Sequence, residues 1–395
     1  MRTNLMTPEI IERYRHDLFE DFLPFMDRYV IDHELGGFCC HADRDGTRLG
    51  SDKDSWYEGR GIWVYSFLYR RFTHDPQHLD IARKTVEAVL RIRPKDDARW
   101  PRRFTRAGET LASDGEIYGP LFIAEGLAEY SAATGERRYW DMAKDIMDSC
   151  IAVYDRPDYP VNSRHYLGDD ALPFPGARVQ GVAMVLLRLA TQMLRTHPDA
   201  ELEAVADRSL EAIMERHHNP AFDLNNEFLN HDYTLPQNGY AQFAYTGHTI
   251  ETMWMVMDEA LRRGGSDLFD RAARRFRRHV EVAWDDVYGG VFRGIRNVDR
   301  NDWLLDKMLW PQEEALIGCL LMAEHRGDTW ALEMFDRIYT YVSGRYRLDR
   351  YGLPLWITTA DRQVTFEPHY NRIENYHHPR HLMLNLLALE RIVGK

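Results

Sequence analysis

The feature that most limits the fold of this chain is a succession of helix-length segments, with apolar residues at helical spacing, that fills nearly the whole sequence. Several are separated only by short turns such as Thr134-Gly135, Gly264-Gly265 and Arg326-Gly327, where glycine favours the end of one helix before the next begins. The pattern therefore predicts helical hairpins. The predicted helices cover residues 8–29, 56–72, 78–92, 118–133, 137–154, 178–194, 202–216, 247–263, 267–284, 310–325, 329–346 and 377–393.

These segments form six pairs, and the pairs recur at a nearly constant distance. Polar or aromatic residues near the start of every second helix are 58, 62, 68, 66 and 63 residues apart. They are Arg60, Tyr118, Gln180, His248, Glu314 and His377. Such a period is typical of a repeated helical hairpin that closes into a ring. In a closed ring, the second helices of the pairs form an inner layer, and their N-terminal ends converge on one axial pocket.

Short stretches with glycine and β-forming residues lie between the pairs. They are Gly36-Gly37-Phe38 and residues 289–292 and 352–356, and we expect them to form small hairpins or loops at one end of the bundle. No linker or change of composition divides the chain, so we interpret residues 1–395 as a single all-α domain.

Charge and cysteine usage exclude several classes of function. Lys and Arg number 50 against 62 Asp and Glu, and the net charge of −12 argues against nucleic acid or an anionic membrane as the main partner. The cysteines Cys39, Cys40, Cys150 and Cys319 include no CxxC pair, which is typical of reduced thiols in a cytoplasmic protein. No apolar run approaches the roughly 20 residues of a membrane span, and we expect no leader or anchor.

A candidate acid/base site begins the helix predicted at residue 247. Positions i and i+3 place His248 and Glu251 on one helix face, and a carboxylate beside an imidazole fixes its tautomer and raises its basicity. The alternative is an ordinary histidine near a helix start and a glutamate that complements the helix dipole.

The last helix begins with a second histidine pair, His377-His378, followed by Pro379 in the first turn. Because the two histidines are adjacent, they must point in different directions. No HxxxH or zincin-like spacing accompanies them, so we predict no metal site.

Two further helix starts combine aromatic and charged residues. Trp310 precedes Glu313 and Glu314, and Trp56 precedes Arg60. Aromatic faces stack on the apolar surface of sugars, while carboxylates and arginine bind hydroxyl groups. Buried tryptophans with solvated charges are the alternative. The sequence contains no P-loop, GxGxxG, GxSxG or HExxH motif, so phosphoryl transfer, nicotinamide chemistry and serine hydrolysis have no local support.

The chain resembles the N-acylglucosamine 2-epimerase family, which includes cellobiose 2-epimerases and related aldose–ketose isomerases. The resemblance extends nearly from end to end, and its short motifs become specific through their order and spacing. They are Gly36-Gly37-Phe38, Asp43-Arg44-Asp45-Gly46, Trp56, Gly59-Arg60, Trp63, Gly247-His248, Ile250-Glu251, Trp310-Pro311, Glu314-Ala315, His377 and Pro379-Arg380.

The resemblance implies an (α/α)6 barrel, and a proton transfer at C2 of an open-chain sugar between two histidines. It implies His248 and His377 as the acid/base pair, Glu251 as the residue that orients His248, and Arg60 as the ligand of the C1 and C2 oxygens. It implies no cofactor. The expected substrate-binding residues are Trp310, Glu314, Tyr118, Gln180, Glu227 and Trp56.

The sequence departs from the family pattern at three places. Thr246 stands where the family usually has proline, and residues 370–375 replace a Gly-Pro-aromatic-Lys segment. Gln180 stands where cellobiose epimerases and the mannose or sulfosugar isomerases have histidine, which favours the N-acylglucosamine branch.

Three classes of function remain after this comparison. The first is a 2-epimerase, or an aldose–ketose isomerase that uses the same residues through a cis-enediolate. The second is a glycoside hydrolase on a helical toroid, for which Glu313/Glu314 or Asp169/Asp170 would be needed, although neighbours i and i+1 on a helix do not face one another. The third is a non-catalytic binding module. A small-molecule sugar is the expected partner, and a homodimer is left open.

Overall fold

The computed structural model describes residues 6–94, 100–113, 115–161, 163–164, 171–349, 352–356 and 372–394. Within them, each predicted helical segment coincides with a helical element. The inner helices are α3 (Ser55–Leu68), α5 (Tyr118–Thr134), α8 (Gln180–Leu194), α10 (Thr246–Arg263), α12 (Leu309–Arg326) and α14 (His377–Val393). The outer helices are α1 (Pro8–His16), α4 (Pro76–Arg91), α6 (Arg137–Tyr154), α9 (Ala200–Glu211), α11 (Ser266–Ala283) and α13 (Thr329–Arg345).

Turns of π-helix and one short α-helix extend several of these elements. The helix that begins as α1 continues through η1 (Asp17–Phe22), α2 (Leu23–Phe25) and η2 (Met26–Val30), η3 (Tyr69–Thr73) extends α3, and η4 (Ala212–Arg216) extends α9. The start of α9 lies before the predicted residue 202 because Asp199 accepts the backbone N–H groups of Glu201 and Leu202 and so caps the helix earlier.

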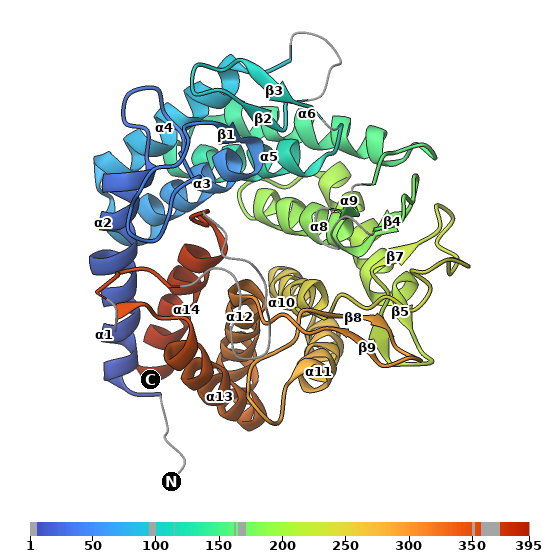
Figure 1. Ribbon diagram of the computed structural model, residues 1–395. Helices are drawn as coiled ribbons and strands as arrows, with labels where there is room; N and C mark the ends of the chain where they lie inside the picture. The colour runs from blue at the N-terminus through green and yellow to red at the C-terminus, as the bar shows by residue number, and fades with distance from the viewer. Residues whose placement is uncertain are drawn as a thin grey trace.

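The helices form the closed double ring that the repeat predicts. Each inner helix packs against the next, in the order α3, α5, α8, α10, α12 and α14, and α14 returns to pack on α3. Each also packs against the outer helix that follows it in the chain, with α14 against α1, and α5 and α12 additionally contact α4 and α11. In Figure 1 the inner helices surround a common centre. The fold is an (α/α)6 barrel.

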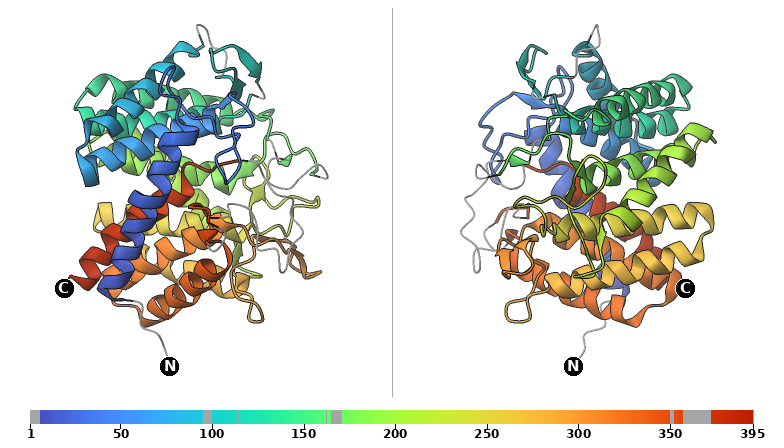
Figure 2. Two further views of the ribbon diagram at one scale, coloured as in Figure 1. Left: turned by 60° about the vertical axis from the view of Figure 1, so that its left-hand side comes forward. Right: turned by 90° about the vertical axis from the view of Figure 1, so that its right-hand side faces the viewer.

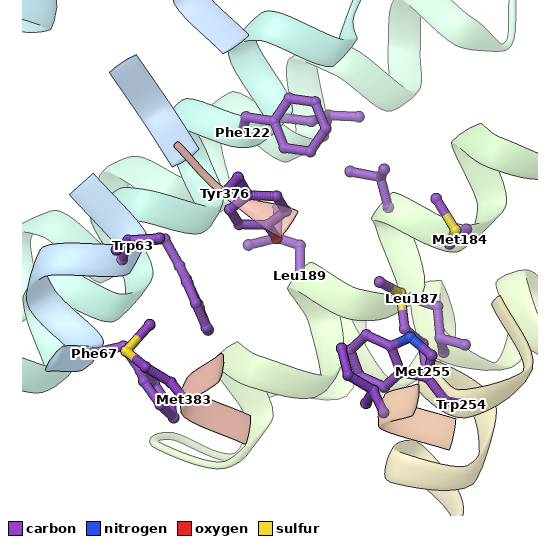
Figure 3. Close-up of a cluster of buried hydrophobic side chains, with 14 of the residues drawn as sticks. Trp63, Phe67, Phe122, Met184, Leu187, Leu189, Trp254, Met255, Tyr376 and Met383 are labelled. Atoms are coloured by element: carbon purple, nitrogen blue, oxygen red, sulfur yellow. The ribbon is translucent and has the colours of Figure 1, made fainter. Parts of the chain in front are cut away.

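The two layers differ in sequence because they differ in burial. Every residue of α8 is buried, since an inner helix is covered by its neighbours and by the outer layer. Helix α11 instead buries Phe269, Phe276 and Val280 on one face and carries arginines on the other. Figure 3 shows part of the core enclosed by the inner helices, where the rings of Trp63 and Phe67 stack with centroids 4.8 Å apart.

The packing of α3 against α5 is extensive and depends on glycine. A Cβ atom on Gly126 would lie 2.5 Å from the carbonyl oxygen of Gly59 and 2.8 Å from Cβ of Ile62, which no real packing tolerates. The absence of side chains at these two positions therefore brings the inner helices together beside the axis.

Short antiparallel strands lie at one end of the barrel, as expected, and Figure 2 shows them gathered on one side with the loops. They are β1 (Lys53–Asp54), β2 (Arg103–Phe104) and β3 (Thr110–Ala112) in one sheet, and the pairs β4 (Arg178–Val179) with β7 (Phe228–Leu229), β5 (His218–Asn219) with β6 (Leu224–Asn225), and β8 (Gly294–Asn297) with β9 (Asp302–Leu304). Residues 178–179, predicted as helix, thus belong to β4, because they pair with β7.

The glycine-containing stretches close small hairpins after the outer helices. Phe38 bridges Ile31, and Val291 bridges Trp284, each in antiparallel fashion. A third bridge joins Arg347 to Trp356. None of the helices in the described ranges is both long and apolar enough to cross a membrane.

Candidate active site

The inner helices begin around an axial cavity of about 260 Å³. His248, the third residue of α10, and His377, the first residue of α14, both line it. Trp310 comes from α12, which lies between those two helices in the ring, and its ring centroid is 5.7 Å from that of His248 and 5.5 Å from that of His377. Two imidazoles from distant parts of the sequence therefore share one cavity and one aromatic neighbour.

The close approach of Trp310 requires the glycine that precedes His248. A Cβ atom on Gly247 would lie 2.7 Å from the indole ring. The Gly-His sequence at the start of α10 thus sets the distance between the first histidine and the tryptophan.

A buried carboxylate holds each histidine at Nδ1. Glu227 Oε1 lies 2.9 Å from Nδ1 of His248, and Glu314 Oε1 lies 2.8 Å from Nδ1 of His377. Both carboxylates are fully buried, whereas the histidine side chains are 16% and 12% exposed. An ionised carboxylate only accepts hydrogen bonds, so it fixes the proton of a neutral ring on Nδ1 and leaves the lone pair on Nε2. Each ring is thus prepared to take up or release a proton at Nε2.

The prediction that Glu251 orients His248 is wrong, because Glu227 occupies that position. The helical spacing assigned this role to Glu251, but Oε1 of Glu251 accepts a hydrogen bond of 2.5 Å from Nη2 of Arg380 on α14. Glu251 lies nearly one turn further along α10 than His248, where a buried guanidinium faces it. The residue at Nδ1 of His248 is Glu227, from the segment between β6 and β7.

Arg380 also fixes the carboxylate behind the second histidine. Its Nη2 donates to Oε1 of Glu314 at 2.6 Å. Burial alone would raise the pKa of Glu314, but Arg380 and His377 hold that pKa well below its ordinary value. Glu314 therefore stays ionised and remains an acceptor for His377.

Aromatic residues and Arg60 form another part of the cavity wall. The guanidinium carbon of Arg60 lies 4.1 Å from the ring centroid of Phe122, 4.9 Å from that of Tyr376 and 5.4 Å from that of Trp56. Tyr118, the first residue of α5, also lines the cavity. The wall combines flat apolar surfaces with a cation, which is the combination expected for a sugar site.

Three residues predicted to bind substrate do not line the cavity. Glu314 and Glu227 lie behind the histidines. Gln180 is fully buried, with its side-chain amide donating to Thr249 Oγ1 and accepting from Asn225. All three lie at or near the correct end of the barrel, but their side chains point into the packing between segments.

Besides the aromatic wall, the site includes Glu374 and Arg380, two charged residues to which the sequence analysis gave no role. Glu374 lines the cavity, and its Oε1 lies 3.8 Å from Nη1 of Arg60. Arg380 joins Glu251 to Glu314. Arg380 belongs to the motif that carries the family resemblance, but neither residue has a spacing signal that reveals its partners.

His378 also lines the cavity, but its partners differ from those of His377. His378 Nδ1 lies 2.5 Å from Oε1 of Glu313, and its ring packs against Phe22 and Trp356. Potential ligand atoms of Glu313, His378 and His381 lie within 4.8 Å of one another, a spacing that could hold a metal ion. Within this group His378 forms a hydrogen bond with Glu313, whereas Nδ1 of His381 lies 3.6 Å from Oε1 of Glu313 and Nε2 of His381 contacts the hydroxyl of Tyr14.

The carboxylate pairs considered for glycoside hydrolysis do not face each other across the cavity. Glu313 binds His378 and Glu314 binds His377, so both are engaged with α14. Asp169 and Asp170 lie outside the described residues.

Comparison with known proteins agrees with this architecture. The family model described as N-acylglucosamine 2-epimerase (GlcNAc 2-epimerase) matches residues 36–378. The chain is 27% identical to the N-acylglucosamine 2-epimerase of Bos taurus over 337 residues, which cover 81% of this chain and 77% of that protein.

Solved structures show the same fold. The cellobiose 2-epimerase of Bacillus thermoamylovorans superposes with a TM-score of 0.81 at 19% identity, covering 96% of this chain and all of that one. A D-mannose isomerase superposes with a TM-score of 0.79 at 14% identity, covering 98% of each chain. The family match and the curated relatives, rather than the fold alone, show that the protein is a carbohydrate isomerase. More particularly, the chain belongs to the N-acylglucosamine 2-epimerase family.

Proposed function

We propose that the protein is a sugar 2-epimerase in which His248 and His377 transfer protons at C2 of an open-chain aldose. The observation that carries this proposal is that both rings line one cavity while a buried glutamate holds Nδ1 of each. A C–H group beside an aldehyde is a weak acid, so its removal requires a base near the carbon and a charge that stabilises the resulting oxyanion.

In the proposed reaction, Nε2 of one histidine accepts the proton from C2. The C–H electron pair forms a C1–C2 double bond, and the carbonyl electrons move to O1, which becomes an enolate oxygen stabilised by Arg60. The other histidine, protonated beforehand, donates its proton to the opposite face of C2. The C1 carbonyl is restored and C2 is inverted. The two histidines have then exchanged protonation states.

The preferred substrate in this proposal is an N-acylhexosamine, because the family match and the cattle relative carry that name. The alternative is an aldose–ketose isomerase, since returning the carbon-bound proton to C1 while the O2 hydroxyl proton passes to O1 yields a ketose from the same residues. The fold shared with a D-mannose isomerase is compatible with this alternative.

Incubation in deuterated water tests the proposal. Candidate sugars are N-acetylglucosamine, N-acetylmannosamine, mannose, glucose, fructose and cellobiose, with products followed by NMR. Deuterium at C2 together with the C2 epimer is the expected result. Deuterium at C1 of a ketose–aldose pair supports isomerisation instead, whereas cleavage without exchange contradicts both. His248→Ala and His377→Ala should each abolish epimerisation while preserving the helical circular dichroism spectrum.

A further inference from the structure

Glu374 lies just before α14, and its two carboxylate oxygens have different surroundings. Oε2 accepts the backbone N–H groups of Tyr376 at 3.0 Å, His377 at 2.7 Å and His378 at 3.4 Å. These are donors at the start of a helix, which have no partner within the helix itself. The backbone of α14 therefore fixes the orientation of this carboxylate.

The other oxygen faces a different environment. Oε1 of Glu374 is buried and has no hydrogen-bond partner in the part of the chain that the structure describes. Glu374 lines the cavity, and the nearest cation is Nη1 of Arg60, which at 3.8 Å is beyond hydrogen-bond distance. A buried acceptor without a hydrogen bond is unfavourable, and more so when it is charged, so a group that enters the cavity gains by donating to it.

Two further observations favour an ionised acceptor. Burial would raise the pKa of Glu374, but His377, Arg60 and the N–H groups at the helix start bring that pKa below its ordinary value. In the neighbouring guanidinium, Nε of Arg60 also lacks a hydrogen-bond partner among the described residues. A hydroxyl group between the two side chains can accept from Arg60 and donate to Glu374 at the same time.

We propose that Glu374 is a substrate-binding residue whose Oε1 accepts a hydrogen bond from a hydroxyl or amide N–H group of the sugar. This inference rests on the proposed function, because it takes a sugar as the occupant of the cavity. It also defines a selectivity. A fixed carboxylate favours a neutral donor group at this place and disfavours a phosphate or carboxylate substituent there, since two negative charges would be brought together in a buried site.

A purely structural role is the competing explanation. By capping α14, Glu374 also holds the backbone of His377, so its replacement could reduce turnover without any contact to substrate. The two roles differ in the kinetic constant that they affect. Loss of a ground-state contact raises KM, whereas displacement of His377 lowers kcat.

The test uses Glu374→Gln, which keeps the shape and one acceptor for the helix start but removes the charge. We expect KM for the best sugar to rise about tenfold or more, as for a lost hydrogen bond to a charged group, with kcat within about threefold of the unmodified enzyme. Asp75→Asn is the matched control, because Asp75 caps outer helix α4 through the N–H of Gln77 and lies outside the cavity lining. This control should leave both KM and kcat unchanged, because asparagine caps a helix about as well as aspartate.

Deoxy sugars then identify the contact. The analogue that lacks the bound hydroxyl should bind the unmodified enzyme about tenfold more weakly than the parent sugar, while Glu374→Gln should not distinguish the two. A fall in kcat at unchanged KM, or the absence of coupling for every hydroxyl and for the 2-acylamino group, would overturn the proposal.

Binding measurements separate this proposal from the proposed function. If no candidate sugar exchanges at C2, the epimerase assignment fails, but saturable calorimetric binding of a sugar that weakens in Glu374→Gln still supports the contact. Absence of sugar binding by the unmodified protein would overturn it. If Glu374→Gln does not fold, the affinities of the deoxy analogues for the unmodified protein test the proposal. Equal affinity of all analogues would exclude a hydrogen bond between Glu374 and the sugar.

Discussion

At the scale of single residues, the chemistry of the site depends on the carboxylates behind the histidines. Glu227 is held on both sides, because its N–H donates to the carbonyl of Phe243 and its carbonyl accepts from the N–H of Gln180, each at 2.9 Å. Its carboxylate therefore has a fixed position relative to Nδ1 of His248.

Replacing this carboxylate should affect turnover more than binding. Glu227→Gln can still accept a hydrogen bond, but it no longer stabilises the imidazolium form, so we expect kcat to fall about 10- to 100-fold with little change in KM. Steady-state kinetics on the preferred sugar measure this, and a kcat equal to that of the unmodified protein would show that Glu227 has no role in proton transfer.

The residues that the sequence could not place share one property, which is that their partners are distant in the chain. Glu227 contacts His248 from a loop, and neither helical spacing nor the order of the motifs reveals this contact. Gln180 and Glu314 lie near the starts of their helices, as predicted. Packing sets the rotation of each helix about its axis, and this rotation directs both side chains into the protein interior instead of the cavity. His248 and His377 could be found because a helix start fixes both their position and their end of the barrel.

At the scale of elements, the loops before α3 and α12 repeat one arrangement. Lys53 binds Asp32 and the carbonyl of Gly36, and Lys307 binds Asp285 and the carbonyl of Gly289. The helices that follow, α3 and α12, differ in one side chain near their starts.

The difference concerns the side chain that faces the glycine hairpin. Glu58 Oε1 accepts the N–H of Phe38 at 3.1 Å, whereas Gln312 both accepts the N–H of Val291 and donates to its carbonyl, each at 2.8 Å. In the equivalent place before α12, the fold therefore has a neutral glutamine where α3 has Glu58.

This comparison predicts a pH-dependent stability. Burial raises the pKa of Glu58 to about 8, so folding takes up a proton between the unfolded pKa and that value. The contribution of Glu58 is full below the unfolded pKa of 4.5 and is lost as pH rises towards 8, at up to about 1.4 kcal/mol per pH unit. Glu58→Gln should remove this slope. Thermal unfolding of both proteins from pH 5 to 8 measures the difference, and parallel Tm profiles would contradict it.

The glycine contact between α3 and α5 gives a second prediction for the elements. Gly126→Ala should lower the free energy of unfolding by about 1–3 kcal/mol, because its Cβ overlaps Gly59 and Ile62. Gly344→Ala is the matched control, since that exposed position in outer helix α13 has nothing within 4 Å of the added atom. There alanine should stabilise by about 0.5–1 kcal/mol through helix propensity. Denaturant unfolding compares the two, and equal effects would refute the packing account.

At the scale of the whole molecule, the ring brings together residues that are far apart in sequence. The repeat of six helical pairs fits a ring, but a repeated helical hairpin can also stack into an open solenoid, so closure is expected from the family resemblance. The interpretation of residues 1–395 as one domain and the absence of a metal site stay predictions. A chelator such as EDTA should leave the initial rate unchanged. A loss of activity that a divalent metal restores would contradict this prediction and would point to a metal at Glu313, His378 and His381 or at Glu251, Glu314 and His377.

The central claim is that two histidines act on opposite faces of C2, and exchange catalysed by single variants tests it most directly. In deuterated water, His377→Asn should exchange the C2 proton of only one epimer, with retention, because His248 alone reaches only one face. His248→Asn should exchange only the other epimer. Neither should interconvert them. A single variant that exchanges both epimers, or that epimerises at the rate of the unmodified protein, would contradict the two-histidine account.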